Sequence, residues 1–269
     1  MARIDLPATI ERIDFPGEVW AWLDLLGDVV VGTQKEAISH ETFMADNLYK
    51  QLLVRSVNRD LTTLNAIYIL LRYEFIHQAA AHVRLFCEAL ITVSYIARDS
   101  TVRVPLFLDY ATIDEYKVAS TLLAWERETA KPGPVAALEE RQRELQIKYD
   151  QLLPKYNRGR LRNWCNATVK TQAKDCGHEK LYEIVYGQMS AYVHGSAWSL
   201  RRQMAYSRKH YDKNVVRVDI ATIVRTTVAV WIEWAKFADR ELGWSLTTKA
   251  GPIAVRCEAL DTEQFEGKY

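Results

Sequence analysis

Residues 60–98, DLTTLNAIYILLRYEFIHQAAAHVRLFCEALITVSYIAR, decide the fold class of this sequence. Apolar side chains recur every three or four residues through the stretch, which is the period of an α-helix. They cover more than one face, so we expect this helix to lie at the centre of the fold. Asp60 comes just before the first apolar residue and is the expected N-cap. The stretch therefore predicts one central helix of about ten turns.

Similar helical patterns flank the central stretch, and no long alternating run predicts a strand. Helices are expected over 18–30, 35–56, 104–129, 135–152, 164–174, 178–200 and 219–242. The residues outside them are expected to form an N-terminal arm over 1–16, an extended excursion over 206–218 and an irregular tail over 245–269. We predict an all-α chain and a single helical-bundle domain over 1–269, with its core at about 60–242 and an inserted polar arm over 132–163.

The composition is that of an ordinary globular protein, with 49% hydrophobic and 26% charged residues in a chain of 269. Disordered and low-complexity classes are therefore excluded. Lysine and arginine number 35 against 34 acidic residues, so the net charge of +1 marks no global nucleic-acid or membrane binder. The charged residues inside 61–97 argue against a membrane span.

Four cysteines occur in the chain and none forms a Cys-x-x-Cys pair. This spacing favours reduced thiols over a disulfide framework, and it does not provide the ligands of a structural zinc site. The N-terminus lacks the pattern of a signal peptide. We therefore expect a cytoplasmic protein with no membrane partner, no metal and no cofactor.

A polar stripe runs along the predicted central helix. Glu74, His77, Arg84 and Glu88 fall within about 80° of one another when residues are placed on a helical wheel. A buried charge must be paired, and Arg84 can pair with Glu88 one turn later. The stripe is thus either a structural ion pair that fixes helix register, a pocket that orients a catalytic or ligand-binding group, or a solvated face.

A second polar row follows in the predicted helix over 178–200. Tyr182, Tyr186, Ser190 and His194 step by four residues along one face, with Tyr192 nearby and Gly195 as a helix stop. A serine one turn before a histidine can hydrogen-bond its ring, and the helix dipole favours the imidazolium in the last turn. The alternative is that His194 is a satisfied core residue.

Two basic stretches with interspersed aromatic residues lie on either side of this row in the sequence. The first contains Arg160, Arg162 and Trp164, and the second begins at Arg201 and Arg202. Basic side chains neutralise phosphates and aromatic rings stack on bases, so RNA is one candidate ligand. Solvated basic loops would give the same composition.

Several of these motifs resemble the domain-of-unknown-function 5677 family of bacteria. The similarity lies in Arg84-Leu-Phe-Cys-Glu88-Ala, Tyr95-Ile-Ala-Arg98, Asn163-Trp164 and Tyr182-Glu-Ile-Val-Tyr186-Gly-Gln-Met-Ser190-Ala-Tyr-Val-His194-Gly-Ser196. It covers roughly residues 60–240. The family has no established activity, so this resemblance implies an all-helical fold and no particular reaction.

A looser similarity links the Val193-His194-Gly195 end to the HEPN superfamily of helical ribonucleases and toxins. That motif has an arginine four to six residues before the histidine, whereas this chain has Met189 at the position five before His194. The resemblance implies a homodimeric, metal-independent ribonuclease, such as a toxin or phage-defence component. His194 would be the general acid or base, and Arg84 would replace the missing motif arginine.

In this reading, Ser190 and Glu88 orient the catalytic pair, and the remaining candidates bind RNA or a nucleotide. These binding candidates are Tyr186, Tyr192, His77, Trp164, Arg160, Arg162, Arg201 and Arg202. Two other hypotheses stay open. The same pocket would serve a non-catalytic module that binds a nucleotide or a protein, and a buried ion-pair network without a pocket would make the chain a structural scaffold.

Overall fold

The computed structural model describes residues 15–39, 47–129, 132–156, 164–193, 197–205 and 212–266. Every regular element within these ranges is a helix, and they contain no strand, which confirms the predicted all-α class. The elements are α1 (Gly17–Ser39), α2 (Leu48–Arg72), α3 (Ile76–Ala97), α4 (Ser100–Thr129), α5 (Pro132–Leu152), the short 3₁₀ helix η1 (Leu153–Tyr156), α6 (Val169–Cys176), α7 (Glu179–Leu181), the π-helix η2 (Tyr182–Tyr186), α8 (Gly187–Val193), α9 (Ala197–Ala205), α10 (Lys213–Leu242) and α11 (Thr247–Glu266).

The predicted central helix over 60–98 is in fact two helices, α2 and α3, separated by three residues. Glu74 interrupts it with a left-handed backbone (φ 58°), and the amide of Phe75 bonds the carbonyl of Leu70 at 2.8 Å to close α2. Neither glycine nor proline marks the break, and the apolar period continues across it. Asp60 is accordingly an interior residue of α2, 1% exposed, rather than an N-cap.

Two other predicted helices differ from the structure in their boundaries. The expected helix over 35–56 does not exist as such, because α1 continues to Ser39 and α2 begins at Leu48. The side chain of Asn47 caps α2 by accepting a hydrogen bond from the amide of Lys50 at 2.8 Å. The expected helix over 164–174 begins only at Val169.

The second half of the chain also differs from the prediction. Residues 213–218, expected to be extended, form the start of α10, which is capped by the Asp212 side chain. The expected helix over 178–200 is divided into α7, η2 and α8, followed by α9. Residues 194–196 and 206–211 lie outside the described part of the chain.

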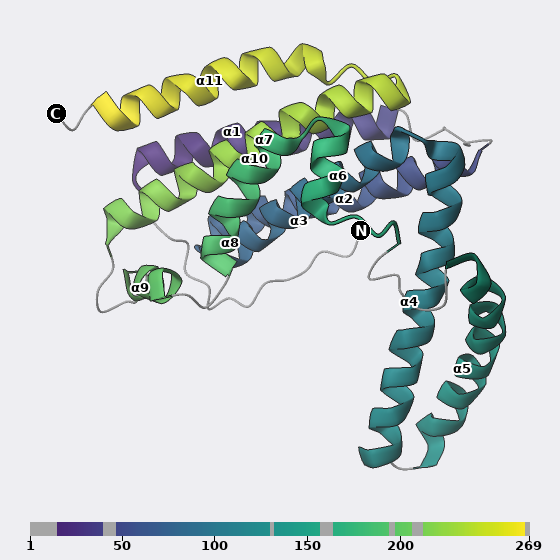
Figure 1. Ribbon diagram of the computed structural model, residues 1–269. Helices are drawn as coiled ribbons and strands as arrows, with labels where there is room; N and C mark the ends of the chain where they lie inside the picture. Colours follow the sequence, from purple (N-terminus) through teal and green to yellow (C-terminus); the bar gives the residue numbers. More distant parts are fainter. Residues whose placement is uncertain are drawn as a thin grey trace. The chain divides into compact units, whose positions relative to one another are not determined.

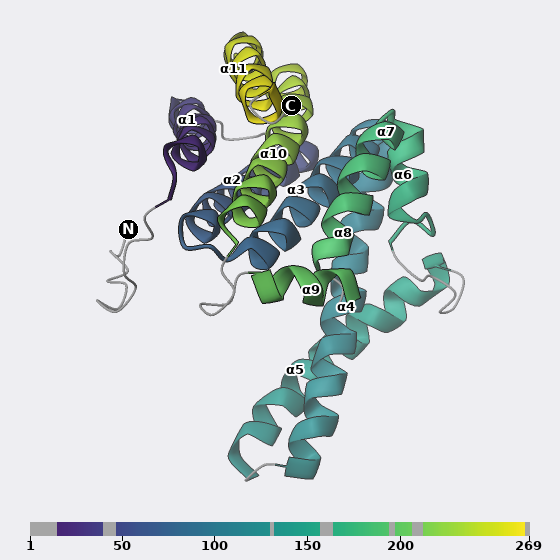
Figure 2. The same cartoon turned by 90° about the vertical axis from the view of Figure 1, so that its left-hand side faces the viewer.

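The chain separates into two compact units, one formed by residues 1–94 and 176–269 and the other by residues 95–175. In the first unit α1 packs against α2, α10 and α11 (Figures 1 and 2). Trp231 and Trp234 of α10 are almost fully buried, and their indole N–H groups donate to Thr33 of α1 at 2.9 Å and to Asp60 of α2 at 3.0 Å. The single domain over 1–269 stays a prediction.

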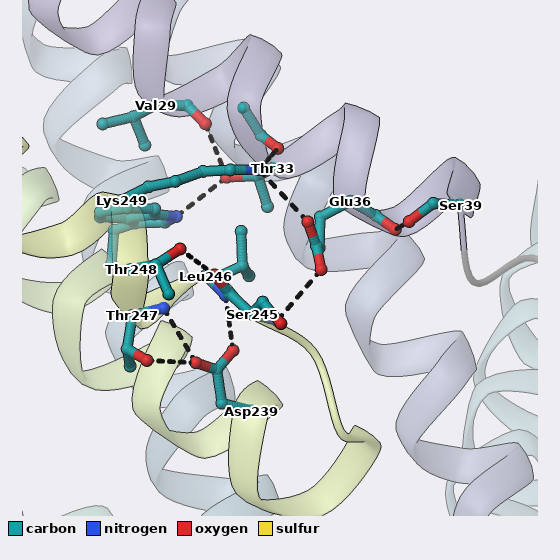
Figure 3. Close-up of polar contacts among 12 residues, drawn as sticks. Val29, Thr33, Glu36, Ser39, Asp239, Ser245, Leu246, Thr247, Thr248 and Lys249 are labelled. Carbon is teal, nitrogen blue, oxygen red and sulfur yellow. Dashed lines mark hydrogen bonds and ion pairs between the residues drawn. The ribbon is translucent and has the colours of Figure 1, made fainter.

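The irregular tail predicted over 245–269 is wrong, because Thr247–Glu266 forms α11. Figure 3 shows the polar contacts that hold its start against α1 and α10. Asp239 accepts hydrogen bonds from the amides of Leu246 and Thr247, both at 2.8 Å. Glu36 of α1 accepts from the amide of Ser245 at 3.0 Å and from Lys249 at 3.2 Å. Side chains from two other helices thus supply the N-terminal caps that sequence periodicity could not reveal.

In the second unit, α4 and α5 form an antiparallel hairpin, of which α5 lies within the predicted polar arm over 132–163. The rings of Tyr116 and Tyr149 stack with centroids 4.3 Å apart, and Arg127 pairs with Glu139 at 2.7 Å. Apolar side chains such as Ile113, Leu123 and Leu145 are also buried in the hairpin, so ion pairs hold it only in part.

Helix α3 is long and apolar enough to cross a membrane by length and composition alone. In this structure 67% of its most apolar window is buried inside the protein. Such burial is typical of the core helix of a folded domain.

Candidate functional site

The candidate site lies where α3 runs alongside the segment from α7 to α8, in the first unit (Figure 2). Three contacts define an antiparallel register along α3. Ser94 meets His178 at 3.2 Å, Arg84 meets Tyr186, and the His77 ring meets the carbonyl of Tyr192 at 2.8 Å. The polar stripe and the tyrosine row predicted from the sequence therefore face one another.

Arg84 is the centre of the first cluster of polar contacts. Its Nε donates to Glu88 at 3.0 Å, and its Nη2 donates to the hydroxyl of Tyr186. The guanidinium carbon lies 4.1 Å from the centre of the Tyr186 ring, a cation–π contact. The Tyr186 ring in turn stacks on Tyr182, with centroids 4.7 Å apart and planes inclined by 24°. We call these four residues the Arg84 platform.

The platform is partly open to solvent, since the side chains of Arg84 and Glu88 are 22% and 28% exposed. Within the described part of the chain, the third guanidinium nitrogen of Arg84, Nη1, makes no hydrogen bond. Burial raises the pKa of the Tyr186 phenol, and the Arg84 charge opposes that rise, so the phenol stays protonated at neutral pH. The platform thus presents a fixed cation and aromatic surface to the solvent.

Tyr192 is the centre of the second cluster. Its hydroxyl donates to Asp219 of α10 at 2.8 Å, and Asp219 also pairs with Arg202 of α9 at 3.2 Å. Its carbonyl accepts from the Ser199 hydroxyl at 3.1 Å and contacts Nδ1 of His77. Burial and the Asp219 carboxylate both raise the pKa of the Tyr192 phenol. We call these five residues the Tyr192 network.

Ser190 lies between the two clusters in the sequence. Its hydroxyl oxygen is buried and makes no hydrogen bond with any residue that the structure describes. The neighbouring Met189 is fully buried (0% exposed) and packs into the core. The side chain that stands where the HEPN motif would have arginine is therefore directed away from solvent.

From the predicted set, the structure brings Arg84, Glu88 and Tyr186 together in one cluster, and His77 and Tyr192 together in another. It does not bring Glu74 onto the same stripe, because that residue lies in the turn between α2 and α3. Trp164 is 8% exposed and packs edge-on against Tyr95 and Phe107 in the second unit. It is buried there and offers no open face for a base.

Of the two predicted arginines on α9, Arg201 is exposed and Arg202 is committed to Asp219. His194, Arg160 and Arg162 lie outside the described residues. The predicted contact between Arg84 and His194 therefore stays a prediction.

Sequence reasoning missed Asp219, the fully buried carboxylate of the Tyr192 network (0% exposed). A signal was available, because Asp219 stands between Val218 and Ile220 at the start of a strongly apolar stretch. An acidic residue in such a position is rarely buried without partners. Because residues 206–218 were predicted to be extended, the predicted helix began at Asp219. In the structure α10 begins at Lys213, so Asp219 is an interior residue of the helix.

The described residues hold no group of three or more histidine, cysteine or acidic side chains that could bind a metal ion. All four cysteines are free thiols. Burial and the nearby Glu88 charge raise the pKa of Cys87 to about 12, and burial raises that of Cys257 to about 11. Neither thiol is activated as a nucleophile.

Comparison with known proteins gives one match, to a family of unknown function (DUF5677), over residues 50–211. This range contains α3, the Arg84 platform and all of the Tyr192 network except Asp219. No curated protein and no solved structure matches the chain.

Proposed function

The chain belongs to the DUF5677 family, and from the geometry of the site we propose that it is a HEPN-like protein that binds RNA and cleaves it without a metal. The Arg84 platform carries the proposal. It offers a guanidinium held by a carboxylate and by an aromatic ring, with one nitrogen left for an anion.

The platform suits a single-stranded nucleic acid for two physical reasons. A fixed guanidinium neutralises a phosphate without losing further side-chain entropy on binding. Stacked tyrosine rings provide an aromatic surface for a base, which is a sequence-tolerant interaction of about 1–3 kcal/mol per base. Both features lie within one patch formed by α3 and η2.

In the proposed reaction, His194 is the general acid or base, and Arg84 stabilises the negative charge that develops on the phosphorane. Glu88 holds the guanidinium in place at 3.0 Å. Ser190 contributes a buried hydroxyl one turn before His194, and Arg201 supplies an exposed positive charge.

The test uses a labelled single-stranded RNA and a labelled RNA hairpin in buffer containing a metal chelator. Wild-type protein is expected to bind by fluorescence anisotropy and to cleave on denaturing gels, and His194→Ala is expected to bind without cleaving. RNA that stays intact and unbound at all protein concentrations would refute the proposal.

The matched control for the platform compares two arginines of the same unit. Arg84→Ala is expected to weaken RNA binding and to lower the salt dependence by about one counterion. Arg55 lies exposed on α2, so Arg55→Ala removes the same charge away from the site. If both variants weaken RNA binding equally, the binding depends only on the net charge of the protein and not on the Arg84 platform.

A second candidate function is a non-catalytic module that binds a nucleotide or RNA end at the same platform. The burial of Met189 favours it, because the arginine position of the HEPN motif is occupied by a core side chain. A nucleotide that raises the melting temperature of the protein without being turned over would support this candidate.

The remaining possibility is that the platform is only a structural ion-pair network. It predicts that Arg84→Met combined with Glu88→Leu would leave stability unchanged or higher, with RNA affinity unaltered. Our proposal expects the double variant to lose RNA binding whatever its stability. We also propose that the protein is a homodimer and acts as a toxin or phage-defence component, as the HEPN resemblance implies, and that it is cytoplasmic, as its cysteine pattern indicates.

A further inference from the structure

We propose that Asp219 is a positioning residue for the candidate site, acting through Tyr192 and Arg202 on the end of helix α8. The inference rests on the proposed function, because His194 follows Val193, the last residue of α8, in the sequence. It concerns a residue on α10 that lies beyond the range of the family match, residues 50–211.

Asp219 is a fully buried carboxylate that contacts donors on two different elements. The Tyr192 hydroxyl of α8 lies 2.8 Å from Oδ1, and the Arg202 guanidinium of α9 lies 3.2 Å from the same atom. A buried carboxylate is strongly disfavoured unless donors of this kind surround it. The structure therefore couples the positions of α8 and α9 to a single atom on α10.

Tyr192 transmits this constraint to α3 through its backbone. Its carbonyl lies 2.8 Å from Nδ1 of His77 and 3.1 Å from the hydroxyl of Ser199. Both the side chain and the main chain of Tyr192 are thus fixed, by α10 on one side and by α3 and α9 on the other. The last turn of α8 is held at both its side chain and its backbone, two residues before His194.

The contacts are more specific than packing alone requires. The Tyr192 ring is buried (5% exposed) and lies edge-on to the His77 ring with centroids 5.9 Å apart, which a phenylalanine would reproduce. Of the Tyr192 side chain, only the hydroxyl contacts Asp219. Removal of the Tyr192 hydroxyl or of the Asp219 charge should therefore leave the core intact and release the end of α8.

The experiment compares Asp219→Asn and Tyr192→Phe with the control Asp261→Asn. Asp261 accepts from Arg225 of α10 at 2.9 and 3.1 Å but is only partly buried, so its variant makes the same chemical change outside the site. Hydrogen exchange measured by mass spectrometry needs no activity. Loss of a hydrogen bond to a charged group corresponds to about a tenfold loss of protection in the peptides that cover α8 and α9.

The expected result is that both network variants lose protection in α8 and α9 but keep it in α1 and α2. In the RNA cleavage assay kcat should fall about tenfold while KM stays nearly constant, because the lost interaction acts on geometry at the reacting group. Asp261→Asn should change neither measurement.

A uniform loss of protection along the chain, or none, would overturn the inference, as would unchanged kcat in variants of an active wild-type protein. Wild-type protein that cleaves no RNA refutes the cleavage proposal, and the exchange data then decide the positioning role by themselves. If Asp219→Asn does not fold, Tyr192→Phe carries the test, because it removes one oxygen atom and keeps the ring.

Discussion

Asp60 should make the stability of this protein depend on pH in a direction opposite to that of most carboxylates. It is 1% exposed, accepts from the Trp234 indole at 3.0 Å and pairs with Arg59 at 3.3 Å. Burial raises its pKa from 3.8 to about 6, although Arg59 and the Trp234 hydrogen bond oppose the rise. The native state therefore binds a proton more tightly than the unfolded chain does.

The sign and size follow from proton linkage. Between pH 4 and 6 the folded protein keeps a proton that the unfolded chain releases, so the free energy of unfolding falls as pH rises. The pKa difference corresponds to about 3 kcal/mol in total. This stabilisation is fully present only below the unfolded pKa of 3.8, and most of it is lost as the pH rises from 4 to 6.

Asp60→Asn removes this titration and keeps an oxygen for the Trp234 indole. Urea unfolding of both proteins should be followed at a series of pH values from 4 to 7.5. We expect the stability of the variant relative to wild type to increase by about 2–3 kcal/mol across that range. A difference that is independent of pH, or that decreases with rising pH, would refute the reasoning.

Three other predictions follow from single features of the structure. Ser190→Ala removes a buried hydroxyl that makes no hydrogen bond with the described residues, so it should leave stability unchanged or raise it by up to about 1 kcal/mol in chemical denaturation, whereas a loss of about 1 kcal/mol would show that the hydroxyl has a partner. Asp239→Ala removes the side-chain caps of α11 and should lower stability by about 1–2 kcal/mol, with protection lost first in α11. Cys87 and Cys257, whose pKa values burial raises to about 12 and 11, should resist iodoacetamide at pH 8 until the protein unfolds, and rapid labelling of the native protein would contradict their burial.

The all-helical class could be predicted because apolar periodicity is strong in α3 and α10. The break at Glu74 could not, because a left-handed residue without glycine leaves no trace in the pattern. Helix α11 was missed because its start is capped by Asp239 and held by Glu36, residues of other helices that only tertiary structure brings near. The apolar period of a sequence indicates which face of a helix is buried, and it contains no information about caps from other helices.

The candidate site was predictable to a similar extent. Spacing identified Arg84 and Glu88 as an i,i+4 pair and placed Tyr186 on one face with Tyr182, and the structure brings the two rows together. Asp219 belongs to a third helix, and no spacing rule connects it with Tyr192. Long-range partners of this kind follow from the packing of helices, which one sequence does not specify locally.

Photochemical cross-linking tests most directly whether RNA lies on the Arg84 platform. RNA containing 4-thiouridine would be irradiated with the protein, digested with trypsin and analysed by mass spectrometry. We predict cross-links on Tyr182 or Tyr186, within the tryptic peptide Leu181–Arg201, and their loss in Arg84→Ala but not in Arg55→Ala. Cross-links confined to other peptides, or equally strong in both variants, would contradict the account.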